Sequence, residues 1–276
     1  LFTEDKTITD AMIKELAKRA LSEPSTLDSS RVFESSVIRV QLNGYPTGSP
    51  VGKKAHHLQV TAFQSDIDQK LRTGVESVLG ASFPGRPVAL RSSIRALLAV
   101  LHERIHGNHY MILSMGTEGT DCISVHKEDL NEHSSLPIGV RSIAQRLSGE
   151  QGLPEEIFSQ LRMLIADTCS TPSCEAIKTN LAKLEPELVR SFAELFSQIS
   201  SRRKIPNTCL LVTHADLAPW LEVFLTRIDF AQFSVTAQPL AVTSLSPAHL
   251  ATQVQWDSSQ HEDTGISLAS AFVNTA

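Results

Sequence analysis

The chain of 276 residues is 41% hydrophobic and 20% charged, with a mean hydropathy of −0.05, so it is expected to fold as a globular protein, and wholesale disorder is excluded. Its formal net charge is −5 and its basic residues do not gather into a stripe, which argues against nucleic-acid binding. The longest apolar run, residues 96–101, is far shorter than the roughly 20 residues of a membrane span, and the first residues lack the basic and apolar segments of a signal peptide.

The first third of the sequence predicts a helix, then two strands joined by a turn, then a second helix. In chain order, their ranges are 9–21, 32–42, 57–63 and 67–78, with the turn at 43–48. Asn, Gly and Pro dominate that turn, and Val and Ile are enriched in the first strand. Residues 32–85 are therefore expected to form a small β-β-α unit of their own.

The next part of the chain predicts a hairpin with a glycine-rich tip. Strands are expected at 110–113 and 122–125, on either side of the turn Gly116-Thr117-Glu118-Gly119. The surrounding elements are, in order, a short strand at 87–90, a buried helix at 94–105, a strand at 135–138 and a helix that ends at Leu147.

From residue 154 to 201 helical spacing replaces the strand signals. Pro172 and Pro186 divide this stretch, because proline does not continue a helix. The expected helices are 154–167, 173–184 and 186–200. The remaining elements are a buried strand at 208–213, a helix capped by Asp216 and ending at Arg227, extended pieces at 233–235 and 240–242, and a helix at 263–273.

The four cysteines show no CxxC spacing, and the chain carries no export signal. Cys122, Cys169, Cys174 and Cys209 are therefore expected to be reduced thiols of a cytosolic protein. A disulfide between Cys169 and Cys174 is the alternative.

His102-Glu103-Arg104-Ile105-His106 matches the HExxH pattern, in which two histidines one helical turn apart bind zinc and the glutamate acts as general base. Gly107 ends the expected helix at once, and no second helix supplies a ligand. Residues that could serve as a third ligand, Glu128, Asp129 and Glu132, lie on a different hairpin. We therefore expect His102, Glu103 and His106 to bind no metal, and a zinc hydrolase is kept as the less favoured alternative.

The glycine-rich hairpin, Leu113 to Asp121, offers backbone N–H groups to an anion, although a tight turn without a ligand would look the same. It resembles the second phosphate loop of the actin-like ATPase superfamily, and most of all that of the PilM and FtsA branch. The phosphate-loop-like residues are Ser114, Gly116, Thr117, Glu118, Gly119 and Thr120.

Three more segments resemble this family in the same order along the chain. Residues 136–143 are similar to its strand-to-helix junction, and the turns at 43–46 and 50–53 are similar to those of the small inserted domain in PilM-like proteins. The segment 213–220 falls where the family has its adenosine-binding turn. The adenosine-turn-like residues are Thr213, His214, Ala215 and Asp216.

The sequence also departs from the family pattern. Ser114 stands where the family's phosphate loop has an aspartate, and His214 and Ala215 stand where the adenosine turn has glycines that let a nucleotide approach. The family's first phosphate loop lies in an N-terminal hairpin that this sequence does not contain, so the chain is expected to be incomplete at its N-terminus. The resemblance thus implies a degenerate nucleotide site, no resident cofactor and at most weak binding of ATP and magnesium.

The resemblance implies an α/β fold of actin-like (ribonuclease H-like) lobes with a small inserted α+β domain. Residues 1–31 and 86–107 would be the remnant of the first lobe and 32–85 the inserted domain. The second lobe would comprise 108–150 and 206–276 in one mixed sheet with its helices, with 151–205 as a helical insertion.

The function implied by the resemblance is that of a cytoplasmic scaffold under the inner membrane. PilM-like proteins bind the cytoplasmic tail of an inner-membrane partner in type IV pilus assembly, and FtsA-like proteins tether the cell-division machinery. The alternative within the family is an active ATPase that holds phosphates at Gly116, Thr117, Gly119 and Thr120. Self-association is left open, and the expected peptide site is the strand edge of the inserted domain, near Arg39, Gln41, His57 and Gln59.

Overall fold

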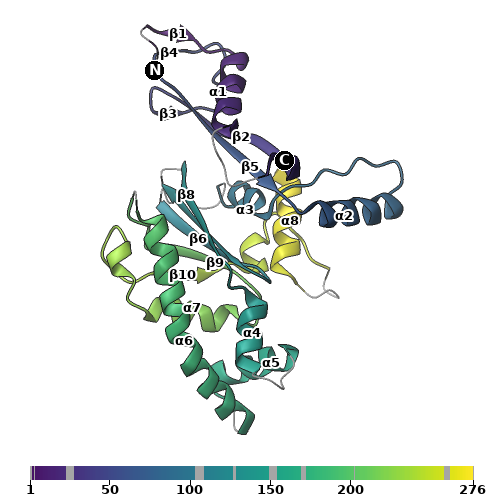
Figure 1. Ribbon diagram of the computed structural model, residues 1–276, viewed down its shortest axis with the longest axis vertical. Helices are drawn as coiled ribbons and strands as arrows, with labels where there is room; N and C mark the ends of the chain where they lie inside the picture. The colour runs from purple at the N-terminus through teal and green to yellow at the C-terminus, as the bar shows by residue number, and fades with distance from the viewer. Residues whose placement is uncertain are drawn as a thin grey trace. The chain divides into compact units, whose positions relative to one another are not determined.

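The structure is a computed structural model that describes residues 2, 4–22, 28–102, 109–126, 129–148, 154–168, 172–201, 203–257 and 262–275. The chain forms two compact units, Leu1–Ala96 and Leu97–Ala276 (Figure 1). Each unit has its own sheet and its own hydrophobic core.

The first unit is built on a three-stranded antiparallel sheet in the order β3-β2-β5. Its strands are β2 (Val32–Leu42), β3 (Tyr45–Pro46) and β5 (Leu58–Asp66), and a two-stranded ribbon joins β1 (Lys6–Thr7) to β4 (Lys54–Ala55). Asn43 organises the turn after β2, because it adopts a positive φ of 53° and its side-chain oxygen accepts hydrogen bonds from the backbone N–H groups of His56 and His57. The predicted pairing of the two long strands is confirmed.

Helix α1 (Asp10–Ser22) covers one face of this sheet. Its Ile13 is buried together with Val40 and Leu58 from the strands. The helix thus shares a core with strands that the sequence analysis assigned to a different domain. The division of the chain at residues 31, 85, 107, 150 and 205 into lobes and insertions stays a prediction.

Helix α2 (Gln69–Ser82) begins at Asp68, whose carboxylate accepts hydrogen bonds from the backbone N–H groups of Lys70 and Leu71. No side chain of α2 is buried. The strand expected at 87–90 is wrong, because these residues form no regular element in the structure. Pro87 has no N–H to give to a ladder, which disfavours a strand there.

A buried carboxylate of β2 binds the segment that begins α3. Glu34 is 4% exposed, accepts a hydrogen bond from the Ser92 backbone N–H at 2.9 Å and pairs with Arg95 at 2.5 Å. These contacts hold the start of α3 (Ser93–His102) against the strand. A buried charge needs such partners, since an unpaired carboxylate would cost several kcal/mol.

The second unit has a five-stranded mixed sheet in the order β10-β9-β6-β7-β8. The strands are β6 (His109–Met115), β7 (Thr120–His126), β8 (Asp129–Leu136), β9 (Thr208–Val212) and β10 (Ala241–Ser244). β6, β7 and β8 are antiparallel, whereas β9 and β10 run parallel to β6. The prediction that the hairpin and the strand after residue 206 share one mixed sheet is confirmed.

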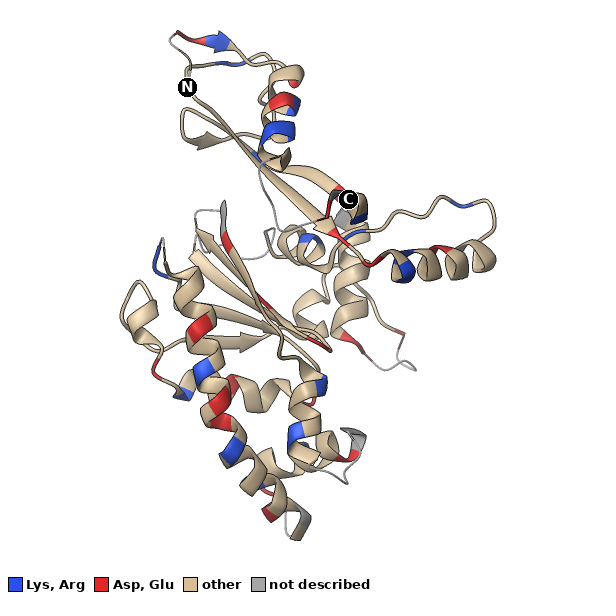
Figure 2. Ribbon diagram, in the orientation of Figure 1, with Lys and Arg blue, Asp and Glu red and all other residues tan. Residues whose placement is uncertain are grey.

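Helices pack on this sheet around an aromatic core that includes Phe192, Phe196 and Phe224. The helices of this unit are α4 (Val140–Ser148), α5 (Pro154–Ile165), α6 (Pro172–Ile199), α7 (Ala218–Arg227) and α8 (Thr264–Thr275). Short 3₁₀ turns occur at Ser29–Arg31 in the first unit and at Ala231–Phe233 and Pro247–Leu250 here. Charged residues of both signs lie along α6, on the sides that do not face the core (Figure 2).

The break expected at Pro186 is wrong, because α6 is one helix of 28 residues with this proline inside it. The residues on either side of the proline, Glu185 and Glu187, pair with Arg227 of α7 at 2.7 Å and with Arg146 of α4 at 3.0 Å. Leu184 and Leu188 are buried in the core. These tertiary contacts offset the hydrogen bond that the proline removes.

Three smaller expectations are corrected. The α7 N-cap is Leu217 and not Asp216, and β8 begins at Asp129 rather than 135. Cys122 and Cys209 are free and buried, as expected of thiols, but Cys174 is disulfide-bonded, and Cys169 lies outside the described residues.

Among the described residues, no helix is long and apolar enough to cross a membrane.

Candidate functional site

Two segments singled out in the sequence meet at one end of the second sheet. The parallel pairing of β6 and β9 aligns Ser114 with Val212, so the turn after β6 and the turn after β9 leave the sheet at the same edge. This is the edge at which open α/β sheets bind their ligands. The fold therefore brings the phosphate-loop-like segment and the adenosine-turn-like segment together.

The loop between β6 and β7 is closed by its own backbone. Gly116 N–H donates to the Gly119 carbonyl at 2.8 Å, directly beyond the last strand pair, Met115 and Thr120. Thr120 is 1% exposed, and its hydroxyl donates to the Ile138 carbonyl at 2.7 Å. This hydroxyl therefore has a structural partner, and it holds the loop to the segment that precedes α4.

The first turn of α4 is packed against the same loop. Val140 N–H donates to the Gly116 carbonyl at 2.9 Å, and Arg141 N–H donates to the Thr117 carbonyl at 3.0 Å. The Gly139 N–H is 3.0 Å from the Ser142 hydroxyl oxygen and donates to it. Amides at a helix N-terminus are the usual donors to phosphate, and here they are satisfied by the protein.

Gly139 permits this close packing. A Cβ at this position would lie 2.4 Å from the Thr117 carbonyl oxygen and 2.5 Å from the Gly119 nitrogen, both backbone atoms. Only glycine fits there without a shift of the loop.

Charged side chains at the loop pair with neighbours on the surface. Glu118 lies 2.6 Å from Arg141, and Asp121 lies 3.0 Å from the His133 ring nitrogen. Ser114, where the resembled loop has its aspartate, is paired across the hairpin with Asp121. Asp121 is the carboxylate nearest to Ser114 along the ladder, but its side chain is already engaged by His133.

The turn after β9 is covered by α5. The Phe158 ring stacks on the His214 ring with centroids 4.6 Å apart and planes 16° apart. One helical turn further on, the Arg162 guanidinium lies 3.1 Å from the Asp216 carboxylate. This carboxylate also lies 3.9 Å from the His214 ring nitrogen.

The other groups of this turn are its backbone carbonyl groups and the hydroxyl of Thr213. The His214 carbonyl accepts hydrogen bonds from the N–H groups of Leu217 and Ala218, both at 3.0 Å, and so begins α7. Ala215 is exposed. The Thr213 hydroxyl oxygen is buried and has no hydrogen-bond partner in the described part of the chain.

Most of the HExxH motif lies outside the residues that the structure describes. Glu103 and His106, with the side chain of His102, lie outside the described residues. Within the residues that the structure describes, no group of three metal-ligating side chains is present.

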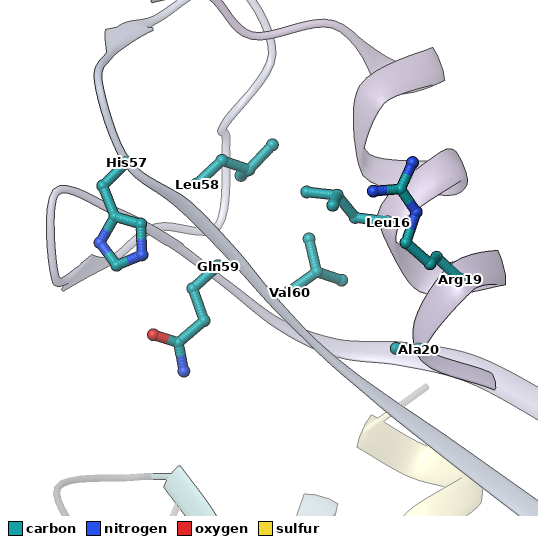
Figure 3. Close-up of a pocket in the computed structure, with 7 residues that line it drawn as sticks. All are labelled: Leu16, Arg19, Ala20, His57, Leu58, Gln59 and Val60. Carbon is teal, nitrogen blue, oxygen red and sulfur yellow. The ribbon is translucent and has the colours of Figure 1, made fainter. Parts of the chain in front are cut away.

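The first unit carries a hollow of about 290 Å³ between α1 and the edge strand β5. Leu58 and Val60 point toward Leu16 of α1, whereas His57 and Gln59 point to the other side of the strand (Figure 3). Arg19 and Ala20 complete the hollow from the helix. Because side chains from both faces of β5 border the hollow, it lies along the strand edge.

In the described part of the chain, no strand pairs with β5 on the side away from β2. Asn43 N–H donates to the His57 carbonyl at 2.8 Å, and hydrogen-bonded pairs alternate along an antiparallel ladder, so Leu58 and Val60 direct their N–H and C=O groups away from β2. The sequence predicted the strand, but it did not predict which residues of α1 line the hollow, because the position of the helix on the strand depends on tertiary packing. Of the contacts it proposed, Gln41 is buried, at 8% exposed, and is not on an open face.

Comparison with known proteins gives a match at the level of fold. No family model and no curated protein matches the sequence. A solved structure described as the PilM-PilN type IV pilus biogenesis complex matches 99% of this chain and 75% of its own, with a TM-score of 0.59 at 16% sequence identity. The chain has the PilM-type actin-like fold.

Two further solved structures match more loosely. The ethanolamine utilization protein EutJ from Carboxydothermus hydrogenoformans covers 53% of this chain and 48% of its own, with a TM-score of 0.35 and 13% identity. The Ppx/GppA phosphatase of Aquifex aeolicus covers 64% of this chain and 52% of its own, with a TM-score of 0.26 and 16% identity. Scores this low carry no argument about the fold or the chemistry of this chain.

Proposed function

We propose that the chain is a PilM-like scaffold that binds the cytoplasmic tail of an inner-membrane partner in type IV pilus assembly. The observation that carries this proposal is the fold match over 99% of the chain to a structure of PilM in complex with PilN. A scaffold of this kind would work in the cytoplasm at the periphery of the inner membrane. The expected ligand is an extended peptide tail.

The hollow beside β5 supports the docking of such a tail. A peptide added as a strand would pair with the outward N–H and C=O groups of Leu58 and Val60. Its alternate side chains would enter the apolar space between Val60, Leu16 and Ala20. Because a free peptide loses conformational entropy when it binds, the affinity is expected to be modest.

We further infer that the chain carries out this role without hydrolysing ATP. The contacts of the loop support this inference, because the first amides of α4 and the Thr120 hydroxyl already have protein partners. Ser114 provides no negative charge that could help to hold a magnesium ion. His214 and Phe158 fill the space beside the turn after β9 with their own stacked rings.

The test is a titration by fluorescence anisotropy with a labelled peptide of the cytoplasmic tail of the PilN-type protein from the same organism. Ala20→Trp fills the hollow and is expected to weaken binding about tenfold or more, because it excludes the anchoring side chains of the peptide. Ala11→Trp is the matched control, since Ala11 is an exposed residue of the same helix that does not line the hollow. Equal affinities for the two variants would show that the peptide docks elsewhere, and no binding by the unmodified chain would contradict the scaffold itself.

A further inference from the structure

The hollow beside β5 combines an apolar surface with a cation. Its α1 side is apolar and is bordered by Leu16, Ala20, Leu58 and Val60 (Figure 3). Among the described residues that line the hollow, Arg19 alone carries a permanent charge, and it extends from the same helix as Leu16, one turn further along (Figure 3). A ligand that fills the hollow therefore meets a guanidinium beside the apolar surface.

The charge of Arg19 is only weakly balanced within the chain. Its Nη2 atom lies 4.0 Å from the Glu15 carboxylate, at the outer limit of an ion pair, and the two side chains are 70% and 66% exposed. An exposed pair of this kind contributes little to stability, so it is easily exchanged for a better partner. The strand side offers no carboxylate, because residues 35–65 contain neither aspartate nor glutamate.

The spacing of the hollow indicates where an acidic side chain of the ligand would lie. A strand added beside β5 turns every second side chain toward α1, and two such side chains are about 7 Å apart. Leu16 and Arg19 are separated by about 4.5 Å along the helix axis. When one side chain of the added strand enters the apolar space at Leu16, the next one on the same face therefore comes within reach of the long Arg19 side chain.

We propose that the tail that docks beside β5 carries an aspartate or glutamate two residues from its apolar anchor, and that this carboxylate pairs with Arg19. The apolar anchor is the side chain that enters the space between Leu16, Ala20 and Val60. A guanidinium can hold a carboxylate through two parallel hydrogen bonds, a stronger arrangement than its 4.0 Å contact with Glu15. This inference rests on the proposed docking of the tail and names the chemistry that the hollow selects.

The experiment is a charge exchange, measured by fluorescence anisotropy with the labelled peptide of the PilN-type tail in about 0.15 M salt, where distant charges are screened. Each aspartate and glutamate of the peptide is replaced in turn by its amide. One replacement, two residues from an apolar side chain, is expected to weaken binding about threefold to tenfold to the unmodified chain and to have no effect on binding to Arg19→Gln.

Reversal of the charge gives the sharper result. Arg19→Glu is expected to weaken binding of the original peptide at least about tenfold, and a peptide with lysine at the same acidic position is expected to restore the affinity to within about threefold. Lys18→Glu is the matched control, because it makes the same change of net charge at an exposed neighbour that does not line the hollow. The control is expected to change the affinity less than about threefold.

Three results would overturn the inference: equal effects of Arg19→Glu and Lys18→Glu, no restoration by the lysine peptide, or full affinity of Arg19→Glu for the original peptide. Each of these leaves the docking of the tail intact if Ala20→Trp still weakens binding. A peptide that does not bind the unmodified chain, or that binds Ala20→Trp equally well, contradicts the proposed docking itself and overturns this inference with it.

Discussion

Single residues decide how the loop between β6 and β7 is held. Gly139 allows the start of α4 to lie against the backbone of Thr117 and Gly119, and Thr120 ties the loop to the Ile138 carbonyl. Thr120 belongs to the segment that resembles the phosphate loop, and Gly139 belongs to the segment that resembles the family's strand-to-helix junction. Their contacts in the structure are with the protein itself, so the same glycine and threonine pattern serves here to close the loop.

Gly139→Ala is expected to destabilise the chain by about 1–3 kcal/mol, because its Cβ would lie 2.4 Å from a backbone oxygen that cannot move away freely. Gly80→Ala is the matched control. Gly80 lies within the exposed helix α2 with no atom within 4 Å of an added Cβ, so alanine there is expected to stabilise by about 0.5–1 kcal/mol. Urea denaturation measures both, and a Gly139→Ala variant as stable as the unmodified chain would show that the loop yields to the helix.

At the scale of elements, β6 and β7 carry a pair of histidines at the end of the hairpin opposite the loop. His109 and His126 face each other across the ladder, and their Nδ1 atoms are 3.1 Å apart, a separation at which one nitrogen donates and the other accepts. His126 is 2% exposed. Burial, followed by the charge of Arg203 and by His109, lowers the pKa of His126 to about 4.

This pKa predicts a loss of stability in acid. The unfolded chain binds a proton on this histidine near pH 6.5 and the folded chain only near pH 4, so the free energy of unfolding falls as the pH is lowered between these values, by at most about 3 kcal/mol. His126→Gln is expected to flatten this part of the profile, whereas His56→Ala, at an exposed site, is expected to leave it unchanged. Urea denaturation at several pH values measures the slope, and an equally steep slope in His126→Gln would rule out this histidine as its source.

The element boundaries that were wrongly predicted from the sequence have one physical cause in common. Pro186 favours a helix end locally, but the buried leucines and the ion pairs around it hold α6 together. Asp216 is a good capping residue, but Arg162 from another helix engages its carboxylate. β8 has too few apolar residues to show alternation, and it forms because β7 supplies the ladder. In each case a contact distant in sequence overrides a local preference.

At the scale of the whole molecule, the order of elements could be predicted and the site only in part. The apolar pattern and the glycine-rich turn predicted the hairpin, and the family resemblance placed it in one mixed sheet with the strand after residue 206, which the structure confirms. The parallel register of β6 and β9, which brings Ser114 and the turn after Val212 to the same edge, is a finding of the structure. The stack of Phe158 on His214 and the hollow between α1 and β5 could not be predicted, because neither leaves a periodic signal in the sequence.

The most direct test of the scaffold proposal is hydrogen–deuterium exchange of the whole chain with and without the peptide of the PilN-type tail. Strand addition at β5 predicts slower exchange on peptide binding for the amides of residues 58–62, above all for the outward N–H groups of Leu58 and Val60. The turn at 213–216 is expected to exchange at the same rate in both states. Binding that leaves the amides of 58–62 unchanged, or that slows only the turn at 213–216, would contradict the proposed docking of the tail on this edge.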